Sequence, residues 1–250
     1  MPSFLCLAGL VAMIAFLVQW LRMSRGKVPV KGDVLLVFAH PDDEAMFFTP
    51  LLFYLRKHQI AVHLLCLSNG NADGLGSVRE KELYESGRFF GIPASNMKVV
   101  NHAELQDGMK NVWPKSVIKH IVNEYLDRIG SIRTIVTFDK HGVSSHPNHI
   151  AVHNGVKEVK ESMPPGLLFV ELITRSIVGK YCGCLSLTNY CLFANTTEYN
   201  GSRFSLSIPP YATLSSFRAM ERHQSQLRWF RYLFVLFSSY TYINEFQPIS

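Results

Sequence analysis

The stretch from position 34 to position 44 reads Val34-Leu35-Leu36-Val37-Phe38-Ala39-His40-Pro41-Asp42-Asp43-Glu44. Its apolar half, Val34 to Phe38, is typical of a strand that is buried on both faces of a sheet. The residues that follow place His40 and the carboxylates of Asp42 and Asp43 within four positions at the mouth of that strand. Such close negative charges repel each other unless a cation or a shared proton relieves them. This stretch therefore predicts a divalent metal with a bound water at a strand end.

A second cluster, His146-Pro147-Asn148-His149, follows another strand-like run over residues 133–138 and a loop over residues 139–145. Two histidines three positions apart project to the same face of a helical turn. Parallel α/β sheets place their sites at the carboxyl ends of strands, so we expect the two clusters to converge. Three protein ligands with one open position are the pattern of a catalytic zinc site.

The residue types suggest a role for each side chain. His40 and Asp43 can reach one ion together with His149 from the second strand end, and these donors suit Zn²⁺ or another divalent transition metal. Asp42 need not bind the ion and is placed to remove a proton from its water as a general base. A protonated His146 would stabilise an oxyanion and pass a proton to a departing amine.

A competing interpretation requires no metal. His40 would then cap the strand, and the acidic residues would favour a helix N-terminus through the helix dipole, with Pro41 at the helix start. Glu44 fits both interpretations, either as a support for the neighbouring ligands or as a solvated acid.

Strand-like and helix-like segments alternate along the chain. We expect strands at 34–38, 61–67, 97–100 and 133–138, and helices at 46–58, 77–91, 114–128 and 150–163. This alternation predicts an α/β fold with a mostly parallel sheet that is flanked by helices. Beyond residue 164 the pattern weakens, and we expect strands at 167–173 and 190–194 and a last helix at about 213–227.

An uncharged apolar run occupies Phe4 to Leu21 and would span roughly 27 Å as a helix. The run is long for the apolar core of a cleavable signal peptide and no basic side chain precedes it, so we expect a retained transmembrane helix. Arg22, Arg25 and Lys27 follow directly. By the positive-inside rule, these charges place the body of the protein in the cytoplasm.

The expected organisation is an anchor helix over residues 1–22, a basic tether over 23–33 and a catalytic domain over 34–250. Two sequons, at Asn195 and Asn200, would matter only in a lumenal domain. Such triplets often arise by chance, so the charges that flank the apolar run carry more weight.

The chain of 250 residues has 25 basic and 19 acidic residues and a net charge of +6. This mild excess suits a membrane-adjacent protein, and no dense basic run or zinc-finger spacing indicates nucleic-acid binding. The five cysteines are odd in number and one lies in the apolar run, so a disulfide framework is not expected. No Gly-x-Gly-x-x-Gly follows the first strand, which argues against a dinucleotide-binding oxidoreductase.

Residues 39–44 together with residues 146–149 resemble the LmbE-like family of zinc-dependent de-N-acetylases. Arg-Glu-Lys-Glu-Leu at 79–83, followed by Gly-Ile-Pro at 91–93, resembles the second signature block of that family. The resemblance implies a Rossmann-like fold and the following roles: a metal held by His40, Asp43 and His149, Asp42 as the base, and His146 as electrostatic stabiliser or acid.

One position departs from the family pattern. Many soluble members have an aspartate where this chain has Asn148. Since Asn148 is not an assigned ligand, we expect the change to tune the site rather than to abolish it.

The apolar N-terminus and the closing segment His223 to Arg231 narrow the resemblance to the membrane-bound branch of the family. The resemblance implies removal of the acetyl group from N-acetylglucosaminyl-phosphatidylinositol, a lipid-linked sugar, in the second step of GPI-anchor synthesis. It also implies a place on the cytoplasmic face of the endoplasmic reticulum membrane. The alternatives are a related deacetylase that acts on another N-acetylglucosaminide and a catalytically inactive membrane scaffold.

Several other positions have two interpretations each. Arg79 either contacts the phosphate or sugar of the substrate or pairs with Glu82 on a helix surface. Asp139 either orients a histidine or binds sugar hydroxyls, or else it forms a turn. The polar loop 70–76 is a candidate substrate rim.

The aromatic and basic stretch 228–242 would either lie among lipid headgroups, with arginines outward and aromatic side chains inward, or pack on the domain as a terminal helix.

Overall fold

The computed structural model describes residues 2–23, 28–183, 185–187 and 203–250. Within these ranges, seven strands form one sheet in the order β3-β2-β1-β4-β5-β7-β6. The strands are β1 (Asp33–Phe38), β2 (Val62–Cys66), β3 (Met97–Val99), β4 (Ile132–Phe138), β5 (Leu168–Leu172), β6 (Phe204–Ser207) and β7 (Ile243–Pro248). The first five are parallel, whereas β7 pairs antiparallel with β5 and β6 antiparallel with β7. The predicted α/β fold with a mostly parallel sheet is confirmed.

The apolar run of β1 is continuous because the strand contributes to two cores. Val34, Leu36 and Phe38 face one core, and Leu35 and Val37 face the other. Successive side chains of a strand point to opposite faces, so a central strand that is covered on both sides needs apolar residues at every position.

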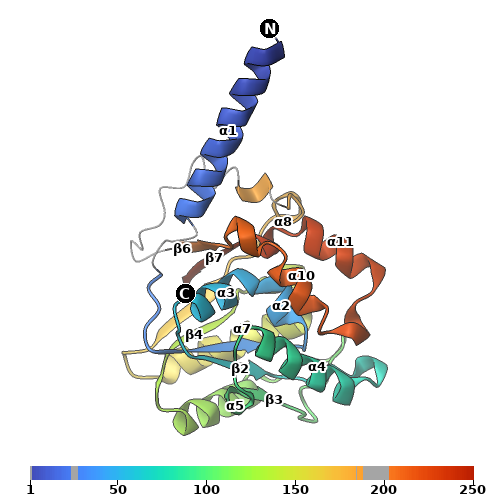
Figure 1. Cartoon of the computed structure of the whole chain (residues 1–250). Coiled ribbons are helices and arrows are strands. Elements are labelled where there is room, and N and C mark those ends of the chain that lie inside the picture. The colour runs from blue at the N-terminus through green and yellow to red at the C-terminus, as the bar shows by residue number, and fades with distance from the viewer. Residues whose placement is uncertain (1, 24–27, 184, 188–202) are drawn as a thin grey trace.

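Helices cover both faces of the sheet (Figure 1). The first core packs helices α2 (Asp43–Phe47), α3 (Thr49–Lys57), α4 (Gly76–Phe89), α10 (Ser215–Met220) and α11 (Trp229–Phe237) against the sheet. The second core packs α5 (Lys115–Arg128) and α7 (Pro147–Ser162). Short helices α6 (Gly142–Ser145) and α8 (Ile177–Lys180) lie in connections after β4 and β5.

Several boundaries differ from those expected. The helix expected at 46–58 is divided at Phe48 into α2 and α3, and α2 already begins at Asp43. The helix expected at 150–163 begins at Pro147, so His149 lies in its first turn. The helix expected at 213–227 is shorter, α11 lies in the stretch 228–242 for which a terminal helix was one interpretation, and β6 and β7 were not predicted. The strand expected at 190–194 and the sequons lie outside the described residues.

The N-terminal helix α1 (Pro2–Met23) extends away from the domain (Figure 1). Its inner end is attached through Trp20, whose indole Nε1 donates to the carbonyl of Ile208 at 2.6 Å. In the part of the chain that the structure describes, no helix combines the length and the apolar character needed to cross a bilayer. The expected span falls on α1, where the side chains of residues 2–5, 7, 8, 12, 19, 22 and 23 lie outside the described residues.

Candidate active site

The two clusters meet because the strands that precede them are neighbours. β1 pairs in parallel with β4, so the carboxyl ends of both strands open at one edge of the sheet. The ring centroids of His40 and His149 lie 5.5 Å apart, and His146 lies 5.0 Å from each of them. The nitrogen atoms that these three rings could offer to a metal all lie within 4.8 Å of one another.

Asp43 lies between two of these histidines. Its Oδ1 is 3.2 Å from Nε2 of His149, and its Oδ2 is 3.8 Å from Nδ1 of His40. The backbone N–H groups of Ala39 and His40 donate to Oδ2 and fix the carboxylate in place. Burial by itself raises the pKa of Asp43, but the neighbouring imidazoles outweigh this effect and leave the pKa well below its usual range. The carboxylate is therefore charged and available as a ligand.

Hydrogen bonds at the far side of each ring indicate which nitrogen faces the cluster. Nδ1 of His149 lies 3.0 Å from the carbonyl oxygen of Gly142, which can only accept, so Nδ1–H donates there and Nε2 is the nitrogen that faces Asp43. Nε2 of His40 lies 3.2 Å from Oδ1 of Asn148 and 3.0 Å from Oδ1 of Asp107. Both partners accept, which leaves Nδ1 of His40 free to bind a cation.

His146 has the opposite arrangement. Its Nδ1 accepts a hydrogen bond from the backbone N–H of Asn148 at the start of α7, so the proton of the neutral ring is on Nε2. Burial and the nearby rings of His40 and His149 lower the pKa of His146 to about 4. A neutral ring that carries its proton on Nε2 donates a hydrogen bond but offers no lone pair there. The geometry thus separates His146 from the two other histidines.

Asp42 precedes Asp43 in the chain, but its carboxylate contacts arginines rather than the histidine rings. Its φ of 123° is a strained value for a residue with a Cβ, and its carboxylate contacts two arginines. Nη2 of Arg231 lies 2.9 Å from Oδ2, and Nη2 of Arg79 lies 3.5 Å from Oδ1. Burial raises the pKa of Asp42 above its ordinary value even though both arginines lower it. The carboxyl group is therefore a stronger base than an exposed aspartate.

Arg79 is buried in this network rather than paired with Glu82. Its guanidinium donates to the carbonyl oxygens of Gly70 and Pro41, both at 2.9 Å, and to Oδ2 of Asp107 at 3.3 Å. These bonds hold the backbone that precedes Asp42 against the loop 70–76, which had been expected to form a substrate rim.

Asp139 forms a turn at the end of β4. Its carboxylate accepts from the backbone N–H groups of His141, Gly142 and Thr174 and from the hydroxyl of Thr174. The turn places the carbonyl of Gly142 against His149, so Asp139 orients a histidine through the backbone. Gly142 has a φ of +59°, and a Cβ there would lie 2.8 Å from the Cβ of His149. Only glycine fits this approach.

Glu44 holds the backbone of Asp42 in place through hydrogen bonds. Its Oε1 accepts from the hydroxyl of Ser86 and from Nε2 of His223, both at 2.6 Å, and its Oε2 accepts from the backbone N–H of Asp42 at 3.1 Å. Glu44 and His223 are both fully buried. Of the two interpretations of Glu44, the structure supports the first, a side chain that holds the site.

The sequence did not point to Asp107, Trp113, His223 or Arg231 as members of the site. Asp107 lies in a polar loop, and Arg231 lies among aromatic residues near the C-terminus. Local sequence offers no signal for either, because their partners lie far away along the chain. Asn148 was noted only as a departure, yet it is fully buried and its Oδ1 also accepts from the backbone N–H of Gly108.

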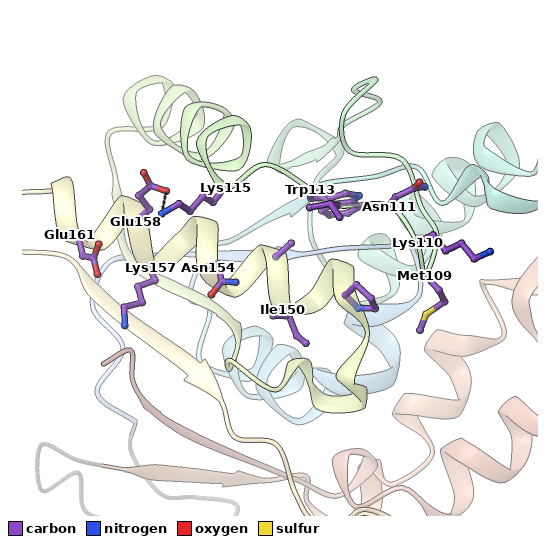
Figure 2. A pocket seen from close by; sticks show the side chains of 13 residues that line it. Met109, Lys110, Asn111, Trp113, Lys115, Ile150, Asn154, Lys157, Glu158 and Glu161 are labelled. Carbon is purple, nitrogen blue, oxygen red and sulfur yellow. Dashed lines mark ion pairs between the residues drawn. The ribbon is translucent and has the colours of Figure 1, made fainter.

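A groove with a volume of about 840 Å³ lies between Trp113 and the side chains of α7 (Figure 2). Trp113 and Pro147 line the end nearest the site, and the ring of Trp113 lies 6.0 Å from that of His40. From there the groove follows α7, where Lys115 of α5 pairs with Glu158 at 3.6 Å. The groove lies next to the site, but His40, Asp42, Asp43, His146 and His149 are not among its lining residues.

Two imidazole nitrogens and one carboxylate that converge on one point form a donor set suited to Zn²⁺ or a similar divalent metal. The buried carboxylate of Asp43 lies beside Nε2 of His149 and Nδ1 of His40, and a cation held by these atoms would balance its charge. The residues present therefore fit a metal held by His40, Asp43 and His149.

Comparison with known proteins identifies the family. Residues 35–160 match the family model described as PIG-L: GlcNAc-PI de-N-acetylase. The chain belongs to the PIG-L family. The resemblance to LmbE-like deacetylases inferred from the two motifs is confirmed.

Curated PIG-L relatives match nearly end to end. The chain is 42% identical over 235 residues to a probable N-acetylglucosaminyl-phosphatidylinositol de-N-acetylase of Schizosaccharomyces pombe, which covers 92% of this chain and 93% of that protein. It is 34% identical over 250 residues to the N-acetylglucosaminyl-phosphatidylinositol de-N-acetylase of Bos taurus, with 96% of each chain covered.

Solved structures share the fold at lower identity. The N,N'-diacetylchitobiose deacetylase of Pyrococcus horikoshii superposes with a TM-score of 0.61 at 15% identity, covering 88% of this chain and 84% of that one. The zinc-inhibited form of teicoplanin deacetylase Orf2 superposes with a TM-score of 0.59 at 14% identity. The match covers 86% of this chain and 97% of that one. These similarities support the PIG-L fold described above.

Proposed function

We propose that this chain hydrolyses the N-acetyl group of N-acetylglucosaminyl-phosphatidylinositol. The products are acetate and glucosaminyl-phosphatidylinositol, and the reaction is the second step of GPI-anchor synthesis. Relatives that match along most of the chain carry this activity in their names. The observation that carries the proposal is Asp42, a buried carboxylate held by arginines beside the set of His40, Asp43 and His149.

His40, Asp43 and His149 would hold a metal, which when bound would polarise the acetamide carbonyl and lower the pKa of a water molecule. Asp42 then removes a proton from the attacking water, a task that its raised pKa favours. The N–H at Nε2 of His146 donates a hydrogen bond to the carbonyl oxygen as that oxygen becomes negative. When the C–N bond breaks, the proton that Asp42 received passes to the amine nitrogen, directly or through His146.

We infer that the metal is Zn²⁺, since two imidazole nitrogens, one carboxylate and an open position are its usual catalytic environment. The predicted binding of the sugar or phosphate by Arg79 and Asp139 is not supported by their contacts. Both side chains are buried and bonded to the protein backbone. We propose instead that both residues position the catalytic groups.

We further propose that α1 anchors the protein in the endoplasmic reticulum membrane with the catalytic domain in the cytoplasm. Exposed apolar side chains along α1 support an apolar environment for it, namely Leu10, Val11, Met13, Ile14, Leu17 and Val18. The basic residues that follow α1 favour the cytoplasmic orientation. Protease treatment of sealed microsomes tests this orientation, because a cytoplasmic domain is digested without detergent.

The deciding experiment is an acetate-release assay with N-acetylglucosaminyl-phosphatidylinositol, run on metal-free protein and after addition of Zn²⁺. We expect activity only with metal. Turnover of a soluble N-acetylglucosaminide alone would indicate the related deacetylase. Absence of acetate release from either substrate, together with weak metal retention, would indicate the inactive scaffold.

A further inference from the structure

Helix α11 turns most of its apolar side chains toward the outside of the protein. Val235 is buried, and Arg231 and Phe234 are half-buried, on the side that faces the domain. The remaining side chains are exposed by between 45% and 74%, namely Trp229, Phe230, Tyr232, Leu233, Leu236 and Phe237. A helix on a water-facing surface normally places its polar residues outward, so this apolar face needs a covering.

Neighbouring elements extend the apolar face. On α8, Ile177 and Val178 are 78% and 77% exposed. The backbone N–H of Gly183, after α8, donates to the carbonyl of Phe237 at the end of α11 at 2.7 Å. We call this the α8–α11 surface, made of Ile177, Val178, Trp229, Phe230, Leu233, Leu236 and Phe237.

The α8–α11 surface lies on the side of the domain from which α1 departs (Figure 1). A hydrogen bond links the two regions, since the hydroxyl of Tyr242 donates to the carbonyl of Leu236 at 3.1 Å. Tyr242 also packs against the small apolar cluster that holds Trp20, at the inner end of α1. A bilayer that receives α1 would therefore meet the α8–α11 surface as well.

We propose that the α8–α11 surface docks into the interfacial layer of a phospholipid bilayer. Trp, Phe and Leu side chains on one face of a helix, with arginines at its edges, are typical of helices that lie in this layer. Arg228, directly before α11, and Arg218, on the neighbouring helix α10, are exposed and would meet lipid phosphates. A symmetric pairing of two copies across this surface would instead bring like charges together.

Docking of this surface would connect the bilayer with the catalytic groups. The inner side of α11 carries Arg231, which holds Asp42 at 2.9 Å. The same nine-residue helix thus contacts lipid on one side and the proposed base on the other. This consequence rests on the proposed function, whereas the docking itself does not.

Fluorescence quenching tests the docking on the full chain in phosphatidylcholine and phosphatidylserine vesicles. The emission of Trp229 is obtained as the difference between the wild-type protein and Trp229→Phe, since Trp20 and Trp113 contribute to both. We expect lipids brominated near the top of the acyl chain to quench this difference and aqueous iodide to leave it unchanged. Quenching by iodide but not by brominated lipid would overturn the proposal.

A kinetic experiment separates docking from the chemistry. In Trp229→Gln/Leu233→Gln, we expect the apparent KM for the lipid-linked substrate in vesicles to rise about tenfold or more, since each side chain loses apolar burial. The kcat/KM for a water-soluble N-acetylglucosaminyl-inositol phosphate should stay unchanged. The control variants are Trp229→Phe/Leu233→Met, which keeps the surface apolar, and Val112→Gln, which removes an exposed apolar side chain elsewhere.

Equal losses on both substrates would show that these residues serve the fold and would overturn the docking proposal. If the wild-type protein turns over neither substrate, the proposed function fails, and the quenching of Trp229 still decides whether the surface docks.

Discussion

Arg231 lies 189 positions after Asp42, yet its Nη2 atom is 2.9 Å from Oδ2 of that aspartate. On the other side, Arg79 approaches Oδ1 at 3.5 Å. The two guanidinium groups hold the carboxylate in one orientation while burial keeps its pKa raised. A base with a raised pKa that is held in a fixed orientation is what water activation requires.

We expect Asp42→Asn to keep its metal and to lose activity by a factor of about 10²–10⁴, because the amide cannot accept the proton of the attacking water. Metal content by atomic emission and acetate release measure the two effects separately. Turnover by Asp42→Asn at the wild-type rate would remove Asp42 from the role of base.

Loss of Arg231 should change the pH dependence. The positive charge of Arg231 lowers the pKa of Asp42, so Arg231→Gln should raise that pKa further. Since the base must be unprotonated, the acidic limb of the kcat/KM profile should move to higher pH. The matched control is Arg88→Gln, because the exposed Arg88 pairs with Glu85 on the surface of α4. A profile for Arg231→Gln that overlays that of Arg88→Gln would contradict the assignment.

His146, the N-cap of α7, and His149, in its first turn, should respond differently to substitution. His149→Ala removes the Nε2 atom that faces Asp43 and should lose most of the bound metal. His146→Ala should retain the metal and lose about 10²-fold in kcat, since it removes a hydrogen-bond donor to the oxyanion. Equilibrium dialysis with Zn²⁺ distinguishes these outcomes. Equal metal loss in both variants would make His146 a ligand.

Asn148→Asp tests the departure from the family pattern. The carboxylate would keep the acceptor that faces His40 and Gly108, so the fold and the metal should be retained. The added charge beside His40 should alter kcat/KM by about tenfold or less. Steady-state kinetics with metal analysis provide the measurement, and a metal-free protein would show that Asn148 is essential.

The pair of Glu44 and His223 should stabilise the fold in a pH-dependent way. We expect Glu44→Gln to lower the free energy of unfolding by about 3–5 kcal/mol, because it leaves a buried imidazole without its charged partner. Glu85→Gln is the control. It removes an exposed partner of Arg88 and should change stability by less than about 1 kcal/mol. Urea unfolding curves provide both values.

The sign of this pH dependence follows from His223. Burial lowers the pKa of His223, but the charge and hydrogen bond of Glu44 outweigh it, and the pKa is raised overall. The stabilisation is therefore complete below the unfolded value of about 6.5 and is lost as pH rises through the folded value. The stability difference between wild type and Glu44→Gln should shrink at alkaline pH. A difference that grows there would contradict the assignment.

Much of the architecture followed from local patterns. The apolar run of β1 and the alternation up to α7 predicted the parallel part of the sheet, because a strand between two helical layers must be apolar at every position. The antiparallel strands β6 and β7 escaped prediction, since strands at the end of the sheet are short and mixed in composition. The place of β7 depends on pairing with β5, and that of β6 on pairing with β7, and no local signal encodes either pairing.

The sequence by itself determined the chemistry that the site can support. His40, Asp42 and Asp43 are neighbours in the chain, and His146 and His149 share one helical turn, so spacing alone brings each set together. Only the tertiary structure decided what surrounds them. Asp107, His223 and Arg231 reach the site from distant segments through packing of the whole domain, and contacts between remote segments leave no periodicity for local sequence to reveal.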